Sequence, residues 1–263
     1  MRGLTFLFSA TLALSATLSF ALQPQVAKML LPVLGGSPSV WNLCLVFFQG
    51  VLFLGYCFAH WLTSQQRLTS QVLLLMALGV VASLFCLPIV LTESSGPASL
   101  DRLDPFWWQT ATLTMHVGLP FLIVSTTGPL LQHWFSRTQH SRASDPYFLY
   151  VASNAGSLLG LLSYPVLIEP FLRLQAQATC WSAGFATLLV LIALCALACR
   201  RFALVTGDAS SVQQANHTSE IPVPPGRAAQ WIFCAFVPSS LSIGVTTYLV
   251  TEIASVPLLW VLP

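Results

Sequence analysis

Long apolar stretches with almost no charge constrain this chain more than any other feature. Each is about 20 residues long, and they lie near residues 4–22, 41–62, 71–91, 107–131, 147–167 and 178–199. A helix rises about 1.5 Å per residue, so such a stretch covers the roughly 30 Å of hydrocarbon in a bilayer. Backbone inside lipid must satisfy its own hydrogen bonds, which only helices and closed barrels do. Because the stretches are continuous and lack period-2 alternation, they predict transmembrane helices and not barrel strands.

Charge is too scarce for a water-soluble protein of this size. Charged residues make up 7% of the 263 residues, against roughly 25% in an average soluble domain. The chain is therefore expected to be an integral membrane protein in contact with the lipid bilayer, and a soluble Rossmann enzyme or a secreted disulfide scaffold is excluded. The net charge of +2 also argues against a nucleic-acid partner. Seven cysteines lie inside apolar stretches without a CxxC pair, so neither disulfides nor a metal or cofactor site is expected.

The first stretch has two interpretations. Arg2 followed by an apolar core and Ser19-Phe20-Ala21 is compatible with a cleaved secretory signal. The core is about 19 residues long, however, against the roughly 7–15 of a signal, which favours an uncleaved first helix.

Arginine asymmetry predicts the orientation of the helices. The loops on the N-terminal side carry seven basic residues and the opposite loops carry three. The first group is Arg2, Arg67, Arg137, Arg142, Arg200, Arg201 and Arg227, and the second is Lys28, Arg102 and Arg173. The positive-inside rule then places the N-terminus in the cytoplasm. His133 and His140, beside Arg137 and Arg142, are interpreted as a solvated basic face that touches anionic lipid.

The hydropathy pattern divides the chain into three parts. Residues 1–199 are expected to form a six-helix transmembrane bundle. Residues 200–229 are rich in Ser, Gln and Pro, which predicts a flexible cytoplasmic linker. Residues 230–263 resume with a seventh helix to about residue 250 and the beginning of an eighth. The predicted fold class is thus an all-α, polytopic helical bundle with the layout of a major facilitator transporter, whose second half is truncated at Pro263.

Several motifs strengthen this interpretation through a resemblance. They lie in residues 22–42, 128–135, 145–159, 164–170, 238–244 and 251–254. In these segments the chain resembles the membrane half of bacterial fused major facilitator/spermidine synthase-like proteins. That resemblance implies a multi-pass protein of the bacterial inner (plasma) membrane. It also implies a soluble, aminopropyltransferase-like domain as partner in the full-length protein.

The enzymatic half of that family has no counterpart in these residues. Aminopropyl transfer needs a Gly-rich turn after a strand together with acidic side chains, whereas Gly35-Gly36 is expected to form a turn between two helices. Paired carboxylates, an HExxH motif and a Ser/His arrangement are also missing from the sequence. The chain is therefore not expected to be an enzyme, and no catalytic residue is predicted.

Polar residues at membrane depth are the candidate functional groups. An ionisable side chain there costs about 2.5–3.5 kcal/mol, so it calls for an explanation. Gln23, Gln25 and Lys28 cluster at the outer end of the first helix, where Pro24 is expected to break the helix and free carbonyls for a cation. In the alternative, Lys28 snorkels to the outer headgroups and the glutamines cap a helix end.

Four further residues complete the candidate set for a substrate path. Glu252 is expected either to face Lys28 across a central cavity or to lie at the outer interface, and Glu169 carries the same ambiguity. His116 is expected to bond a carbonyl near Pro120 or to relay a proton. Asn154 is expected to form an interhelical hydrogen bond, and the small residues Ala152, Gly156 and Gly160 beside it predict close helix packing.

Two functions from different classes follow. The first is a transporter-like module that moves polyamine-like or other small cationic solutes. The alternative is a non-transporting membrane anchor for the soluble aminopropyltransferase-like domain.

Overall fold

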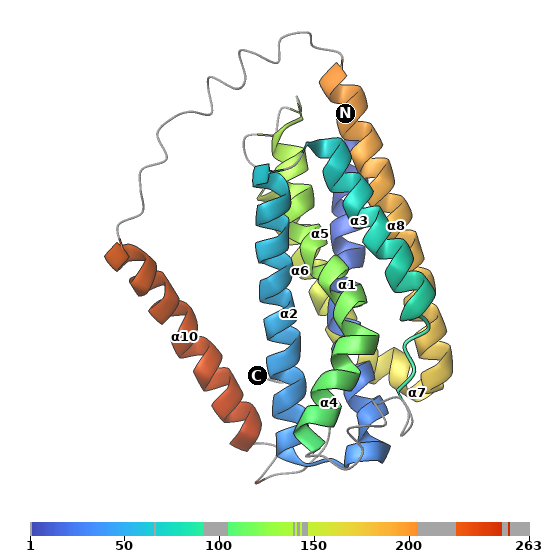
Figure 1. Ribbon diagram of the computed structural model, residues 1–263, viewed down its shortest axis with the longest axis vertical. Helices are drawn as coiled ribbons and strands as arrows, with labels where there is room; N and C mark the ends of the chain where they lie inside the picture. The colour runs from blue at the N-terminus through green and yellow to red at the C-terminus, as the bar shows by residue number, and fades with distance from the viewer. Residues whose placement is uncertain are drawn as a thin grey trace.

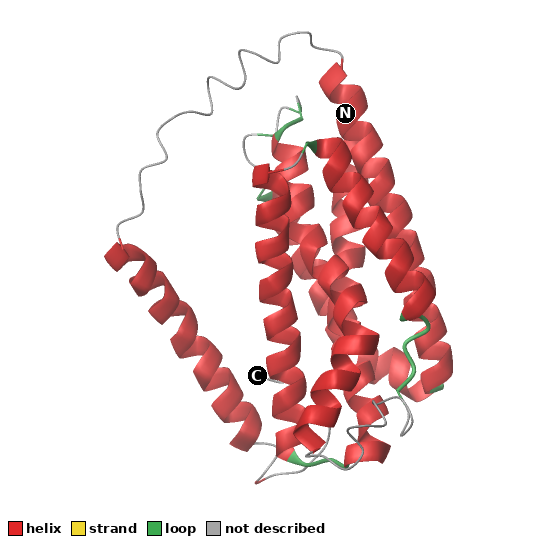
Figure 2. Ribbon diagram, viewed as in Figure 1, coloured by secondary structure: helices red, strands yellow, loops and turns green. Residues whose placement is uncertain are grey.

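The computed structural model describes residues 2–65, 67–91, 105–138, 140, 143, 147–204, 225–248 and 252. All secondary structure within these ranges is helical (Figure 2). Six helical passes are long and apolar enough to cross a membrane. The prediction of a multi-pass helical membrane protein is confirmed at this level.

The six passes run alternately up and down between the two ends of the bundle (Figure 1). Four passes are single helices, of which α3 is the shortest, and two contain a π-helical turn. In chain order the elements are α1 (Arg2–Leu34), α2 (Pro38–Gln65), α3 (Leu68–Phe85), α4 (Pro105–Leu113), η3 (Thr114–Gly118), α5 (Leu119–Ser136), α6 (Phe148–Ser163), η4 (Tyr164–Ile168), α7 (Glu169–Phe171) and α8 (Leu174–Leu204). We call the end that holds the start of α1 the N-terminal end, and the other the opposite end.

The first two passes are joined by the glycine turn that the sequence predicts. Gly35 has a φ of +76°, a backbone conformation that side chains with a Cβ rarely adopt. Its N–H donates to Leu31 O at 3.0 Å and closes the last turn of α1.

Pro24 does not break the first helix, contrary to the sequence-based expectation. α1 is continuous from Arg2 to Leu34 with Pro24 and Pro32 inside it. A transmembrane helix tolerates proline where neighbouring helices and local side chains compensate for the missing hydrogen bond. Val26, Ala27 and Leu30 around this point are fully buried, so tertiary packing keeps the helix continuous where an isolated segment would break.

Two later prolines are accommodated by a change of helical geometry. The π-helical segment Thr114–Gly118 ends two residues before Pro120, and Tyr164–Ile168 ends two residues before Pro170. A proline ring clashes with the carbonyl four residues earlier in an α-helix, and a widened turn moves that carbonyl aside. Both passes therefore continue across the bilayer without a break.

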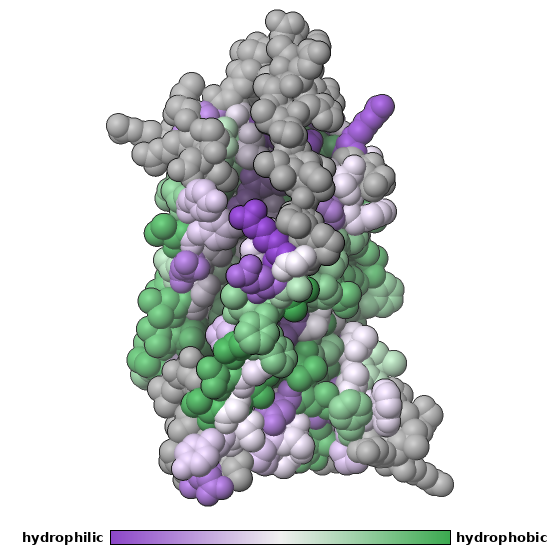
Figure 3. Space-filling view, turned by 90° about the vertical axis from the view of Figure 1, so that its left-hand side faces the viewer, coloured by the Kyte–Doolittle hydropathy of each residue, from purple (hydrophilic) through white to green (hydrophobic). Residues whose placement is uncertain are grey.

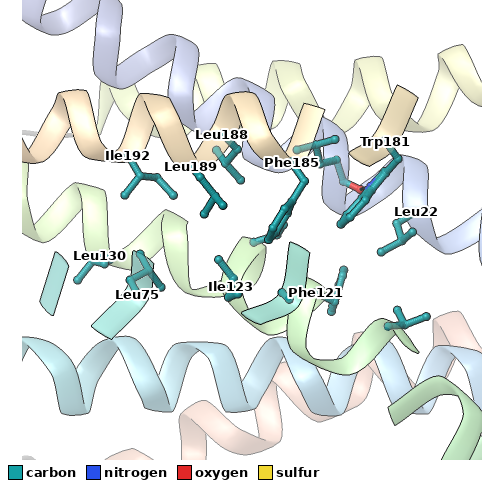
Figure 4. Packing of buried hydrophobic residues seen from close by; sticks show 14 of the residues in the cluster. Leu22, Leu75, Phe121, Ile123, Leu130, Trp181, Phe185, Leu188, Leu189 and Ile192 are labelled. Atoms are coloured by element: carbon teal, nitrogen blue, oxygen red, sulfur yellow. Dashed lines mark hydrogen bonds between the residues drawn. The ribbon is translucent and has the colours of Figure 1, made fainter. Parts of the chain in front are cut away.

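α1 lies inside the bundle, between α5, α6 and α8. The side chains of α8 point toward α3 and α5 and fill the space between these helices (Figure 4). Interhelical hydrogen bonds cross the same core: Trp181 Nε1 donates to Leu18 O at 3.0 Å, and Ser15 Oγ donates to Val124 O at 3.0 Å. These bonds fix the register of α1 against its neighbours.

Gly156 and Gly160 bring α6 into direct contact with the backbone of α1. A Cβ at Gly156 would overlap the carbonyl oxygen of Ala13, and one at Gly160 would lie 2.6 Å from Thr17 O. Thr17 Oγ1 also approaches Gly156 O at 3.0 Å. The close helix packing predicted from the small residues is confirmed.

The last helix, α10 (Pro225–Tyr248), stands beside the bundle and meets α2 (Figure 1). Asn42 Nδ2 approaches Thr247 Oγ1 at 3.4 Å. In the view of this side, hydrophobic side chains lie beside and below the centre of the molecule, and hydrophilic ones lie at the centre at mid-height (Figure 3). Most of the predicted linker, and the predicted eighth helix apart from Glu252, lie outside the described residues.

Candidate functional site

A polar cavity of about 440 Å³ lies between four of the membrane-spanning helices. Its floor comes from α1 and α5, where Ser15, Ser19 and Ser125 are buried. Its rim comes from α2 and α6, where the lining residues Gln49 and Asn154 are exposed. Along α1 the lining extends from Leu12 to Gln23, a length of about 16 Å at 1.5 Å per residue. The cavity therefore spans the middle of α1, and along α5 and α6 it extends toward the N-terminal end of the bundle.

The hydroxyl groups of this cavity are arranged as hydrogen-bond acceptors. Ser15 Oγ donates its proton to Val124 O, Ser125 Oγ to Phe121 O at 2.7 Å, and Ser157 Oγ to Ser153 O at 2.9 Å. A hydroxyl whose proton is committed to a carbonyl still offers its oxygen lone pairs. The lining therefore presents oxygens to whatever occupies the space.

Amide and aromatic side chains add further acceptors, although each amide also offers N–H donors. Gln23 Nε2 lies 3.4 Å from Ser19 O, which leaves the Gln23 carbonyl oxygen available. Tyr56 and Tyr150 line the cavity from α2 and α6. Ring faces of this kind attract cations, so the cavity combines oxygen acceptors with aromatic surface.

Lys28 and Glu169 form an ion pair outside the cavity, closer to the opposite end of the bundle. Lys28 Nζ lies 2.6 Å from Glu169 Oε1, and the bridge joins α1 to α7. The two side chains are 32% and 27% exposed, so the pair is neither fully solvated nor fully buried. The partner of Lys28 is thus Glu169 and not Glu252, which the sequence analysis placed opposite Lys28 as one of two alternatives and which is exposed.

Gln25 and His116 are buried to different extents and neither lines the cavity. Gln25 is 3% exposed, and its Nε2 has no hydrogen-bond partner among the described residues. His116 lies in the π-helical segment with Nδ1 3.1 Å from Thr112 O, which fits the structural role considered for it. Of the predicted set, only Gln23 and Asn154 share the cavity.

Most of the polar side chains of the cavity were not predicted, because five of them are serines, which barely lower the hydropathy of an apolar stretch. A signal was nevertheless present in their spacing. Ser15, Ser19 and Gln23 follow one another at i+4 on α1, and Tyr150, Ser153 and Ser157 recur at i+3 and i+4 on α6. Such spacing places a polar stripe on one face of a helix.

A cysteine in this cavity is expected to react with a charged thiol reagent, because only a thiolate in water is nucleophilic. In a chain with its seven native cysteines replaced by alanine, Ser153→Cys should be modified at least about tenfold faster than Leu158→Cys. Leu158 is on the same helix but is 57% exposed toward the surrounding lipid. The measurement is the mass shift over time in open membrane fragments. Equal rates of modification for the two cysteines would show that water does not enter the cavity.

Protein-family models, curated proteins and solved structures were each compared with the chain, and none of them matches it.

Proposed function

We propose that this chain is a membrane carrier module whose cavity binds a small solute rich in hydrogen-bond donors. The observation that carries the proposal is the acceptor-lined space between α1, α2, α5 and α6. Its volume of about 440 Å³ falls within the roughly 300–1,000 Å³ of ligand pockets. Polar groups at this depth are costly unless they face water or a ligand. A cavity that holds a solute explains why Gln49 and Asn154 lie at membrane depth.

The charge of the lining narrows the class of solute. Among the described residues, those that line the cavity include no Asp, Glu, Lys, Arg or His. A polyamine with several positive charges would be desolvated there without a counter-charge, which is expensive. An amine with one charge fits better, because hydroxyl oxygens, the Gln23 carbonyl and the tyrosine faces can share it. Within the cationic solutes inferred from the sequence, we therefore favour singly charged amines.

The distribution of basic residues indicates which side of the membrane the cavity faces. Arg67, Arg137, Arg200 and Arg201 lie at the N-terminal end, whereas Lys28 and Arg173 lie at the opposite end. With the positive-inside rule, this distribution supports a cytoplasmic N-terminal end and a cavity that extends from the middle of the bundle toward the cytoplasm. A bacterial inner membrane, a major facilitator-like second half and a soluble aminopropyltransferase-like partner rest on the resemblance in sequence.

Flux through reconstituted vesicles tests the carrier. We expect uptake of labelled ethanolamine, weaker uptake of spermidine, and at least about a tenfold loss of uptake in Gln49→Leu and Asn154→Leu, if each removes about 1.4 kcal/mol of solute binding. Gln175→Leu is the matched control, because Gln175 is exposed at the start of α8 and outside the cavity. Absence of flux for both solutes, with all variants folded, would overturn the carrier and favour the membrane anchor.

A further inference from the structure

Four arginines lie at the N-terminal end of the bundle. They have no carboxylate partner among the described residues, whereas Lys28 at the opposite end pairs with Glu169. Arg67, Arg137, Arg200 and Arg201 are exposed. Within the described ranges, the Lys28–Glu169 bridge is the one ion pair, and no carboxylate pairs with any of these guanidinium groups. Among the described residues, this end therefore carries positive charge without a paired carboxylate.

A pocket of about 150 Å³ opens among these charges. It is bounded by Leu68 and Gln71 of α3, by the end of α5 and by Cys199 of α8. Trp134 Nε1 donates to Gln71 Oε1 at 2.7 Å, and this bond fixes the pocket wall between α3 and α5. The pocket is thus a formed feature of the helix ends and does not depend on a loop.

Three groups in and around this pocket are suited to a phosphate. Arg137 lines the pocket at the end of α5, and its guanidinium group can bind a phosphate through two hydrogen bonds. α3 begins at Leu68 without a side-chain cap, so its first N–H groups and its dipole favour a negative charge. Arg200 Nη2 donates to Thr69 Oγ1 at 3.2 Å, which brings another guanidinium to the same turn.

The surroundings indicate that the anion belongs to an amphiphile. The pocket lies where the spans of α3, α5 and α8 begin or end, which is the depth of lipid headgroups. One turn further into the membrane, Leu73 lies below Thr69 on α3 and Leu197 lies below Arg200 on α8. Their side chains are 65% and 46% exposed. A phosphate on the polar turn would therefore continue into acyl chains on an apolar surface.

We propose that the turn formed by the start of α3 and the ends of α5 and α8 is a binding site for the phosphate group of an anionic phospholipid. The guanidinium groups of Arg137 and Arg200 and the N-terminus of α3 hold the headgroup. The exposed leucines of α3 and α8 contact its chains. Free phosphate shares the headgroup chemistry but lacks the apolar part, so it should bind far more weakly.

Lipid retention measured on the full chain by native mass spectrometry tests this site. After exchange into detergent with equal amounts of phosphatidylglycerol and phosphatidylcholine, the chain should retain phosphatidylglycerol preferentially. Arg137→Gln and Arg200→Gln should each lower that preference about fivefold, since a basic residue near the surface contributes about 1 kcal/mol. Arg173→Gln, which removes an exposed arginine at the opposite end, should change nothing.

Several outcomes would overturn the proposal. Equal retention of the two lipids would show that the chain has no site selective for an anionic headgroup. An equal effect of Arg173→Gln would reduce it to non-specific charge attraction. Displacement of the lipid by millimolar inorganic phosphate would assign the site to the free anion. Size-exclusion profiles show which variants fold, and Arg67→Gln replaces either test variant that does not.

Discussion

A Gly156→Ala variant is expected to lose about 3 kcal/mol in its free energy of unfolding. The added Cβ would overlap the carbonyl oxygen of Ala13 on α1. That oxygen belongs to the backbone of a buried helix, so no rotamer change relieves the overlap. α1 and α6 would have to move apart along a closely packed interface and would lose van der Waals contacts that drive helix association in lipid.

Unfolding in mixed micelles with increasing sodium dodecyl sulfate measures this change. Gly50→Ala is the control, because no atom lies within 4 Å of a Cβ built at Gly50 on α2. Alanine has a higher helix propensity than glycine by about 0.8–1.0 kcal/mol, so Gly50→Ala should be neutral or stabilising. The opposite signs of the two substitutions separate packing from propensity.

A second substitution distinguishes the backbone contact from a side-chain contact. Because the overlap is with the Ala13 carbonyl oxygen, adding Ala13→Gly to Gly156→Ala should not restore stability. Full recovery in that double variant would contradict the geometry of the α1–α6 contact. Gly160→Ala, whose Cβ would meet Thr17 O at 2.6 Å, should be destabilised in the same direction.

Local patterns predicted the features that depend on neighbouring residues in the chain. The six spans follow from hydropathy because each helix must match the bilayer by itself. The close approach of α6 follows from the spacing of Gly156 and Gly160, since small residues on one helix face permit close packing whichever helix comes next. The sequence did not indicate that this helix would be α1.

Features that depend on distant residues could not be predicted in the same way. The partners Lys28 and Glu169 are 141 residues apart, and hydropathy assigned each of them separately to an interface. The continuity of α1 through Pro24 depends on helices packed around it, so a rule for isolated helices gave the wrong result. The cavity forms only when the polar residues of four helices come together. The polar residues on any one of these helices are too few to predict a cavity.

Removal of either partner of the Lys28–Glu169 ion pair is expected to destabilise the bundle by about 2 kcal/mol. This value lies between the roughly 0–1 kcal/mol of a surface pair and the roughly 3–5 kcal/mol for breaking a buried one, because the two side chains are 32% and 27% exposed. Lys28→Met leaves a carboxylate at the edge of the hydrocarbon, and Glu169→Gln leaves an ammonium group there. Both variants also release the link between α1 and α7.

A double-mutant cycle built from Lys28→Met and Glu169→Gln separates the interaction energy of the ion pair from the cost of leaving either charge unpaired. The charge-swapped variant Lys28→Glu/Glu169→Lys should recover most of the stability in the same micelle assay, since it restores a bridge between the two helices. Arg173→Gln removes an exposed cation at the same end and should change the unfolding free energy by less than about 0.5 kcal/mol. A coupling energy below about 0.5 kcal/mol would mean that water screens the bridge, and α1 and α7 would then be held together by packing alone.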